Sequence, residues 1–198
     1  VITNLVTVGG LSGNYVVSGV LNVNAGVAGS LQLLSGAVLN WSGGTISSGL
    51  DVTNGAVVNW SGGTLSGSSL VRAGGILNWS NGDLGGPLTV GVNGVANISG
   101  SYKTLFNVLT NYGVVTWTGG GLRCAYNGSS WLGSIYNQAG ALWDCQCDAA
   151  LDYYYNSGER FYNAGEFRKT SGSGTTTVNL AFNNSGVVNA LQGTINFN

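Results

Sequence analysis

A 19-residue repeat constrains the fold of this chain more than any other feature. The segment Gly-Ala-Val-Leu-Asn-Trp-Ser-Gly-Gly-Thr-Ile begins at Gly36 and returns with conservative changes at Gly55, and its pattern continues from Gly74 and from Asn93. A fixed period near this length is typical of a chain that stacks one small unit on itself. One unit is too short to bury a core alone, so the sequence predicts a core that successive units share.

Aligned repeats form columns in which the chemistry of the side chain is retained. Each unit reads as about three short strands separated by Gly, Ser and Asn. Strands that pair with their counterparts one turn on would bury a continuous core. We therefore predict an all-β, single-stranded β-solenoid, or β-helix, of about nine turns. Its repeat ladder consists of Asn40, Asn59, Asn78 and Asn97, and of Trp41, Trp60, Trp79 and Trp117, with Trp143 as a further tryptophan.

The glycine content favours corners over helices. Of the 198 residues, 35 are Gly, and Gly, Asn, Ser, Thr and Val are all weak helix formers. A corner often needs a positive φ, which Gly adopts without a steric penalty. The glycines expected to open turns in this way are Gly36, Gly55, Gly94, Gly113, Gly140, Gly165 and Gly186.

No composition break divides the chain, so we predict one solenoid domain over residues 1–198. Residues 1–112 contain the regular short turns. Beyond them the spacing of turn-opening glycines grows, to 27 residues between Gly113 and Gly140. Insertions in a solenoid emerge at its corners. Residues 113–198 are therefore predicted to form longer turns with corner loops.

Charged side chains are scarce. They make up 7% of the chain, with six Lys and Arg against seven Asp and Glu, so no basic stripe is available for nucleic acid. No apolar run approaches the roughly 20 residues of a membrane-spanning helix. The chain begins at Val1 and contains no Met and no signal segment, which suggests a mature or excised product. We expect a secreted protein, located outside the cell or on its surface.

The orientation of the tryptophan column is open at this stage. Side chains alternate along a strand, so Leu39 and Trp41 share one face and Val38 and Asn40 share the other. Packing of the indole rings in the core is the simpler interpretation. Outward rings would instead be available to stack on the rings of a polysaccharide.

Three cysteines, Cys124, Cys145 and Cys147, would allow one disulfide in an oxidising compartment. The long turns bring Cys124 near the other two in the predicted stack, so a bridge from Cys124 to one of them is plausible. Alternatively, Cys145 packs inward as a small apolar residue.

Catalytic side chains are few, and we do not expect an enzyme. The absence of His from the sequence removes the usual general base and the commonest metal ligand. A lone Cys-Gln-Cys motif is a weak metal signal, so no metal or other cofactor is expected. A less favoured hypothesis is a polysaccharide-degrading enzyme, which needs two carboxyls about 5 to 10 Å apart. The acidic cluster that could supply them is Asp144, Asp148, Asp152, Glu159 and Glu166.

Aromatic residues gather in the predicted long turns. They either fold the long loops onto the rod or form an exposed surface for a polysaccharide or a partner subunit. A glycan-binding module is therefore the alternative to a structural protein. Its possible binding surface is Tyr126, Trp131, Tyr153, Tyr154 and Tyr155.

From Phe161 onward the chain reads FYNAGEFRKTSGSGTTTVNLAFNNSGVVNALQGTINF. This segment, together with the earlier Asn-Trp-Ser-Gly-Gly-Thr units, resembles the Asn- and Gly-rich repeats of very large secreted surface proteins of environmental bacteria, and the resemblance covers nearly the whole chain. A turn in that family carries F-x-N-x-G, then Lys before Gly-Thr-Thr, then F-N-N-x-G and G-T-I. The resemblance implies a β-solenoid with an adhesin-like or structural role, and it supplies no catalytic motif. The matching positions are Phe161, Asn163, Gly165, Lys169, Gly174, Thr175, Thr176, Phe182, Asn183, Asn184, Gly186, Gly193, Thr194 and Ile195.

Both ends of the chain read as strands without a polar cap. An uncovered end of a solenoid offers unpaired strand edges and open core. The predicted function is a secreted structural subunit that stacks end to end with further copies into an extracellular filament or adhesive stalk. The residues expected at the assembling ends are Val1, Ile2, Leu5, Ile195 and Phe197.

Overall fold

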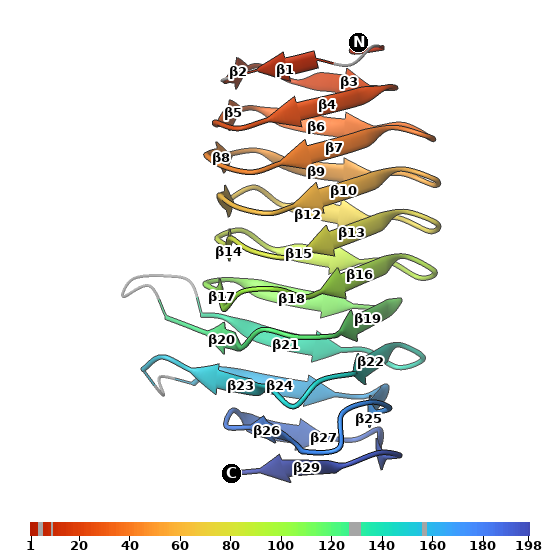
Figure 1. Cartoon of the computed structure of the whole chain (residues 1–198), viewed down its shortest axis with the longest axis vertical. Helices are drawn as coiled ribbons and strands as arrows, with labels where there is room; N and C mark the ends of the chain where they lie inside the picture. Colours follow the sequence, from red (N-terminus) through yellow and green to blue (C-terminus); the bar gives the residue numbers. More distant parts are fainter. Residues whose placement is uncertain (4–5, 9, 127–131, 156–157) are drawn as a thin grey trace.

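The computed structural model describes residues 1–3, 6–8, 10–126, 132–155 and 158–198. In these residues the chain coils into a β-solenoid of about nine turns with about 19 residues per turn, and every regular element is a strand. Figure 1 shows the turns stacked along one axis, with the two termini at opposite ends. The fold class predicted from the repeat is confirmed.

Three parallel sheets run the length of the stack, and each complete turn contributes one strand to each sheet. Sheet 1 contains β1 (Val6–Val8), β4 (Val20–Val23), β7 (Val38–Trp41), β10 (Val57–Trp60), β13 (Ile76–Trp79), β16 (Val95–Ile98), β19 (Val114–Trp117), β22 (Leu142–Cys145), β25 (Glu166–Lys169) and β28 (Val187–Ala190).

Sheet 2 contains β2 (Leu11–Ser12), β5 (Val27–Ala28), β8 (Thr45–Ile46), β11 (Thr64–Leu65), β14 (Asp83–Leu84), β17 (Lys103–Leu105), β20 (Leu122–Cys124), β23 (Ala150–Tyr153), β26 (Thr175–Val178) and β29 (Thr194–Phe197). Sheet 3 contains β3 (Tyr15–Val17), β6 (Ser30–Leu33), β9 (Gly49–Val52), β12 (Ser69–Val71), β15 (Leu88–Val90), β18 (Val108–Asn111), β21 (Ser134–Asn137), β24 (Arg160–Asn163) and β27 (Ala181–Asn184).

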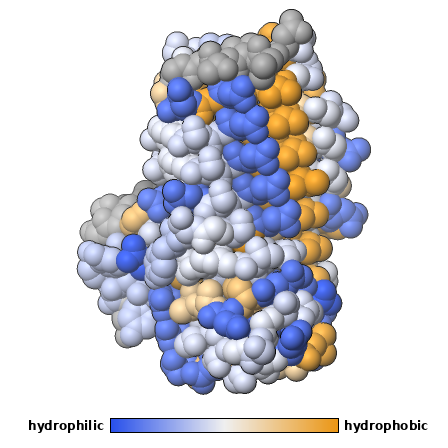
Figure 2. Space-filling model, viewed as in Figure 1, coloured by the Kyte–Doolittle hydropathy of each residue, from blue (hydrophilic) through white to orange (hydrophobic). Residues whose placement is uncertain are grey.

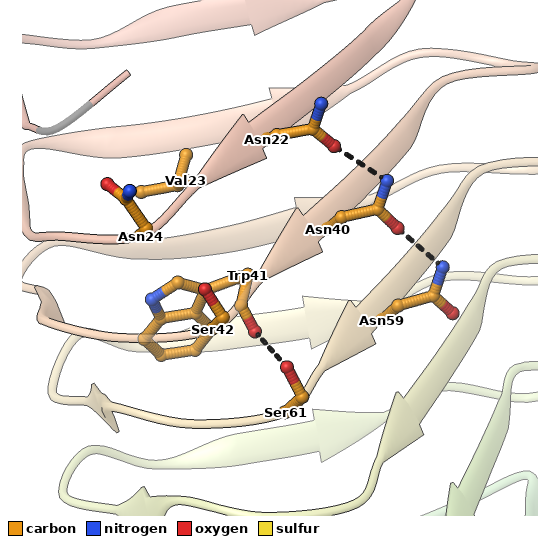
Figure 3. A pocket seen from close by; sticks show the side chains of 8 residues that line it. All are labelled: Asn22, Val23, Asn24, Asn40, Trp41, Ser42, Asn59 and Ser61. Atoms are coloured by element: carbon orange, nitrogen blue, oxygen red, sulfur yellow. Dashed lines mark hydrogen bonds between the residues drawn. The ribbon is translucent and has the colours of Figure 1, made fainter. Parts of the chain in front are cut away.

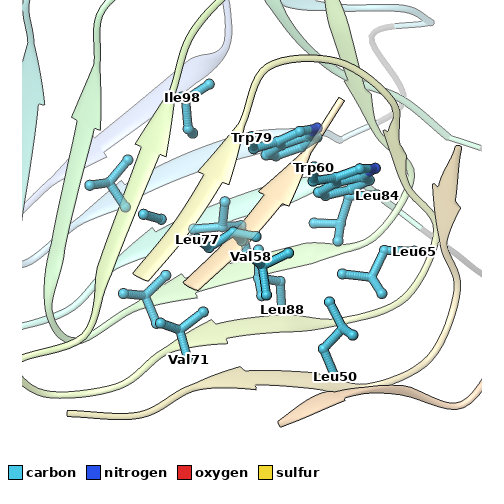
Figure 4. Close-up of a cluster of buried hydrophobic side chains, with 14 of the residues drawn as sticks. Leu50, Val58, Trp60, Leu65, Val71, Leu77, Trp79, Leu84, Leu88 and Ile98 are labelled. Carbon is cyan, nitrogen blue, oxygen red and sulfur yellow. The ribbon is translucent and has the colours of Figure 1, made fainter. Parts of the chain in front are cut away.

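The tryptophan column faces the core. Trp41, Trp60, Trp79 and Trp117 are each at most 1% exposed. The Trp60 ring stacks between those of Trp41 and Trp79, with centroids 5.0 and 4.6 Å apart and nearly parallel planes. Figure 4 shows the rings of Trp60 and Trp79 stacked among buried leucines. The outward alternative for this column is therefore wrong.

The Trp-Ser-Gly-Gly motif has a local physical basis. The indole N–H of Trp60 donates to the backbone carbonyl of Gly62 at 3.0 Å, and that of Trp41 donates to Gly43 at 2.6 Å. A buried indole N–H needs an acceptor, and here the following corner provides it. The motif thus combines a large apolar ring with a corner carbonyl that satisfies its one polar atom.

Trp143 does not belong to this column. In the register between β19 and β22, Val115 pairs with Trp143, and Trp117 pairs with Cys145. Trp143 is still buried, where it packs edge-on against Phe161 with centroids 5.2 Å apart. The lengthened turn shifted the motif by two residues, which keeps Trp143 on the inward face but places it in a neighbouring column.

Glycines open the corners for two different reasons. Gly36, like Gly55 and Gly140, has a positive φ, of 79°. Gly113 does not, and the expectation of a positive φ there is wrong, as it is at Gly94, Gly165 and Gly186. A Cβ at Gly113 would lie 2.3 Å from the carbonyl oxygen of Gly94 in the turn before, so the close stacking of turns excludes a side chain.

Candidate functional site

The asparagine column forms a ladder on the outer face of sheet 1. Asn40 Nδ2 donates to Asn22 Oδ1 at 2.8 Å, and Asn59 donates to Asn40 at the same distance. The series continues through Asn78 and Asn97 at 2.9 Å per step. Figure 3 shows the first two of these bonds beside a small groove. Since each amide bonds to the next, the ladder ties successive turns together.

The ladder is part of a regular outer face. An aliphatic column runs beside it, because Val38, Val57 and Ile76 occupy the outward position two residues before each Asn. Figure 2 shows a hydrophilic stripe and a hydrophobic stripe side by side over this part of sheet 1. The repeat therefore determines the outside of the rod as well as its core.

A second amide ladder lies inside the molecule, and the sequence pattern did not predict it. Asn111 Nδ2 donates to Asn137 Oδ1 at 2.9 Å, Asn137 donates to Asn163 at 2.8 Å, and Asn163 donates to Asn184 at 2.7 Å. The first three side chains are at most 1% exposed. Each ends a strand of sheet 3 two or three residues before a corner Gly, and this recurrence is the signal that could have revealed the ladder.

The three cysteines, all within the described residues, are free thiols. The disulfide expected from Cys124 is therefore absent. Cys124 lies inward in β20 and Cys145 lies inward at the end of β22, in two different sheets. Burial raises the pKa of all three thiols, so they are poor nucleophiles.

The acidic residues of the long turns each have their own partners. Asp144 accepts hydrogen bonds from Thr170 at 2.7 Å and from Arg168 at 3.1 Å. Burial raises the pKa of Asp144, but these bonds and one from Gln146 outweigh it, so the pKa is lowered overall. Asp148 Oδ1 accepts from Lys169 Nζ at 2.6 Å, which lowers the pKa of this carboxyl. Both carboxylates thus serve as acceptors that link successive turns.

Lys103 and Lys169 are fully buried, which the sequence pattern did not predict. Lys103 Nζ donates to the carbonyls of Ser99 and Ser101. Lys169 Nζ donates to the carbonyls of Cys147 and Ser171 as well as to Asp148. Both ammonium groups therefore satisfy corner carbonyls that the sheets leave unpaired. Burial lowers the pKa of Lys103 to about 8.

Only part of the predicted aromatic surface lies among the residues that the structure describes. Trp131 lies outside the described residues, and Tyr126 is half-buried. Tyr153, Tyr154 and Tyr155 are exposed at the end of β23. The structure adds Tyr102 to this group, which comes from an earlier turn.

Arg123 lies between two of these tyrosine rings and contacts both. Its guanidinium carbon lies 5.2 Å from the centroid of the Tyr102 ring and 4.5 Å from that of Tyr154. Tyr155 contacts Tyr154 edge-on at 4.3 Å. The Tyr102 hydroxyl donates to Asp152 Oδ2 at 3.1 Å. Burial and the nearby Asp152 raise the pKa of Tyr102 to about 12. We call Tyr102, Arg123, Asp152, Tyr154 and Tyr155 together the tyrosine cluster.

The last turn presents an apolar end face. Phe182, Val188 and Ile195 are only partly buried, and they pack on the core from one side. Phe197 is 41% exposed and Leu191 is 69% exposed. At the other end, Val1 is exposed and Ile2 forms a bridge to Val17. Leu5 lies outside the described residues.

Among the described residues, no three His, Cys, Asp or Glu side chains are grouped so that they could hold a metal ion. The same residues contain no helix that is long and apolar enough to span a membrane. Comparisons of the chain with protein-family models, curated proteins and solved structures found no match.

Proposed function

We propose that the protein is a structural β-solenoid, secreted to the outside of the cell or its surface, that stacks end to end with further copies into a filament or adhesive stalk. The apolar end face carries this proposal. Phe182, Val188 and Phe197 each continue a core column in the last turn. Their partners in the turn before, Phe161, Phe167 and Val178, are fully buried. Covering them with another turn would remove apolar surface from water.

The direction of the strands favours a head-to-tail contact. Every sheet is parallel and runs from the first turn to the last. A second copy on the same axis would place its β1, β2 and β3 beside β28, β29 and β27, and all three pairs would be parallel. Such a contact joins two different surfaces and does not close, so it generates a filament.

The chemistry of the surface supports an exterior, structural role. With 7% charged residues, the outer faces rely on neutral Asn, Ser and Thr side chains. Amide ladders and a continuous core link each turn to the next, and such coupling stiffens a rod. The resemblance of the C-terminal turns to repeats of large secreted surface proteins points the same way.

Electron microscopy of the purified protein over a concentration series tests the proposal. We expect filaments of the width of one solenoid, and we expect Ile195→Asp to give discrete rods because it places a charge on the end face. Phe197→Lys should act in the same way, because Phe197 is 41% exposed on the end face. Thr45→Asp is the matched control, since it adds the same charge to the outer face of β8.

Discrete rods of the unaltered protein at the highest concentration would argue against end-to-end stacking. So would filaments that persist in both end-face variants. Circular dichroism should show the same strand content in all four proteins, which separates loss of stacking from loss of fold.

A further inference from the structure

We propose that the tyrosine cluster, with the groove that continues from it along sheet 2, binds a neutral polysaccharide chain. The first observation is the exposure of the rings. Tyr154 and Tyr155 are 51% and 61% exposed, and Tyr102 and Tyr153 are both above 40%. Scattered exposed aromatics are ordinary, but a contiguous group of them marks an interaction site.

The second observation is that the exposed rings are held in place. Arg123 lies between the rings of Tyr102 and Tyr154, and the ring of Tyr155 packs edge-on against that of Tyr154. The Tyr102 hydroxyl is fixed by Asp152. Cation–π and edge-on aromatic contacts of this kind hold the rings in one orientation. A ring ordered before binding loses less entropy when a ligand stacks on it.

The third observation is a row of polar groups beside the rings. Asp152 lies next to Arg123 in the register of β20 and β23. Asn179 donates to Asp152, and Asn198 donates to Asn179 at 2.6 Å. These three residues line a groove of about 530 Å³ together with Tyr153 and Ala181. The groove continues from the tyrosine cluster along the axis of the stack.

This combination fits a sugar chain better than other ligands. A pyranose ring has an apolar C–H face, which stacks on an aromatic ring, and hydroxyls at its edge, which bond to amides and carboxylates. Arg123 and Asp152 balance in charge, so the site favours a neutral sugar over an acidic one. The row follows the rod from turn to turn, and this suits an extended chain rather than a compact ligand.

Isothermal titration calorimetry with cello-, xylo-, manno- and chitohexaose, and with polygalacturonate as the acidic comparison, tests the proposal. We expect at least one neutral hexasaccharide to bind. Tyr155→Ala should weaken that binding by about tenfold or more through loss of the stacking ring. Tyr155→Phe should keep affinity within about threefold, because it retains the ring. Asn59→Ala, on the amide ladder of sheet 1, is the control and should leave binding unchanged.

Failure of all four neutral sugars to bind at millimolar concentration would overturn the proposal. Binding that survives in both Tyr155→Ala and Tyr154→Ala would overturn it too. If Tyr155→Ala instead changes the sedimentation of the protein without sugar, the surface contacts a second copy and the proposal is wrong. Filament formation by Tyr155→Ala should match that of the unaltered protein, so the result is independent of end-to-end stacking.

Discussion

At the scale of single residues, several large side chains in this core carry an N–H group that donates a hydrogen bond to a backbone carbonyl at a corner. Each tryptophan of the 19-residue motif is buried with its N–H on a corner carbonyl, as at Trp60 and Gly62. Lys103 and Lys169 are buried on the same principle, with ammonium groups that cap corner carbonyls. Burial of a polar atom without a partner is costly, so the corner carbonyls favour tryptophan and lysine at these positions.

Replacement of Trp60 by Ala should destabilise the protein by about 3 to 5 kcal/mol, because it leaves a cavity between two stacked rings. Chemical denaturation monitored by circular dichroism measures the change. Val57→Ala truncates an outward side chain on the same strand and should cost less than about 1 kcal/mol. Similar losses for the two variants would contradict the account of a ring-packed core.

Lys103 should make the free energy of unfolding of the protein depend on pH in the alkaline range. Its pKa is about 8 in the folded protein, below the ordinary 10.5, because burial disfavours the charged form. The unfolded chain thus binds more protons between these values, and this residue's contribution to stability rises as pH increases through that window. Relative to Lys103→Met, the unaltered protein should gain roughly 1 to 3 kcal/mol from pH 8 to pH 10.5.

Unfolding titrations of both proteins across this pH range measure the difference. Burial raises the pKa of the Cys147 thiol and the charge of Lys103 lowers it, so Cys147 is replaced by Ser in both proteins before their stabilities are subtracted. A constant difference in stability from pH 8 to pH 10.5 would show that the folded pKa of Lys103 is not depressed.

At the scale of elements, strands and corners are joined by ladders that cross from turn to turn. The parallel register places like residues beside each other, so one amide can donate to the next along a column. The same amide-to-amide arrangement occurs on the outer face at Asn59 and in the interior at Asn137. Comparing the two positions therefore isolates the effect of burial on the contribution of an amide ladder to stability.

Asn137→Ala should therefore cost about 2 to 4 kcal/mol, while Asn59→Ala should cost less than about 1 kcal/mol. Removing Asn137 leaves the buried Asn163 Oδ1 and the carbonyl of Glu166 without their donor. Removing Asn59 exposes its partners to water, which replaces the lost bonds. Thermal and denaturant unfolding of the two variants gives the comparison, and equal losses would refute the assignment of a buried ladder.

At the scale of the whole molecule, the solenoid is a one-dimensional stack. A strand in an inner turn, such as β13, pairs on both edges, with β10 and β16. Among the described strands β28 pairs with β25 alone. Stability in such a stack is the sum of contacts between neighbouring turns.

Amide hydrogen exchange should accordingly be slowest in β10 and β13 and faster in β27, β28 and β29, where opening breaks one interface instead of two. Mass spectrometry of exchanged peptides at low protein concentration measures the profile. At high concentration, end-to-end stacking should slow exchange in the last turn. Uniform exchange along the rod at both concentrations would contradict both statements.

The 19-residue period by itself determined that the chain is a β-solenoid. Repeated apolar columns, corner glycines and short alternating segments have one common solution, in which each strand pairs with its counterpart one turn on. The period also predicted which residues share a column in the regular turns, such as Asn40 with Asn59 and Trp41 with Trp60. Equal spacing in sequence becomes equal register in a parallel sheet.

Only the tertiary structure decided which face of each strand is enclosed and which distant residues meet. Alternation divides a strand into two faces without saying which one is inside. Beyond residue 113 loops of unequal length hide the register, so Trp143 was expected in the tryptophan ladder and Cys145 occupies that position instead. The contact of Arg123 with Tyr102 and Tyr154 joins three successive turns. Its formation depends on how the loops of unequal length align those turns with one another. Periodicity determines neighbours where the turns are equal, and packing determines them where they are not.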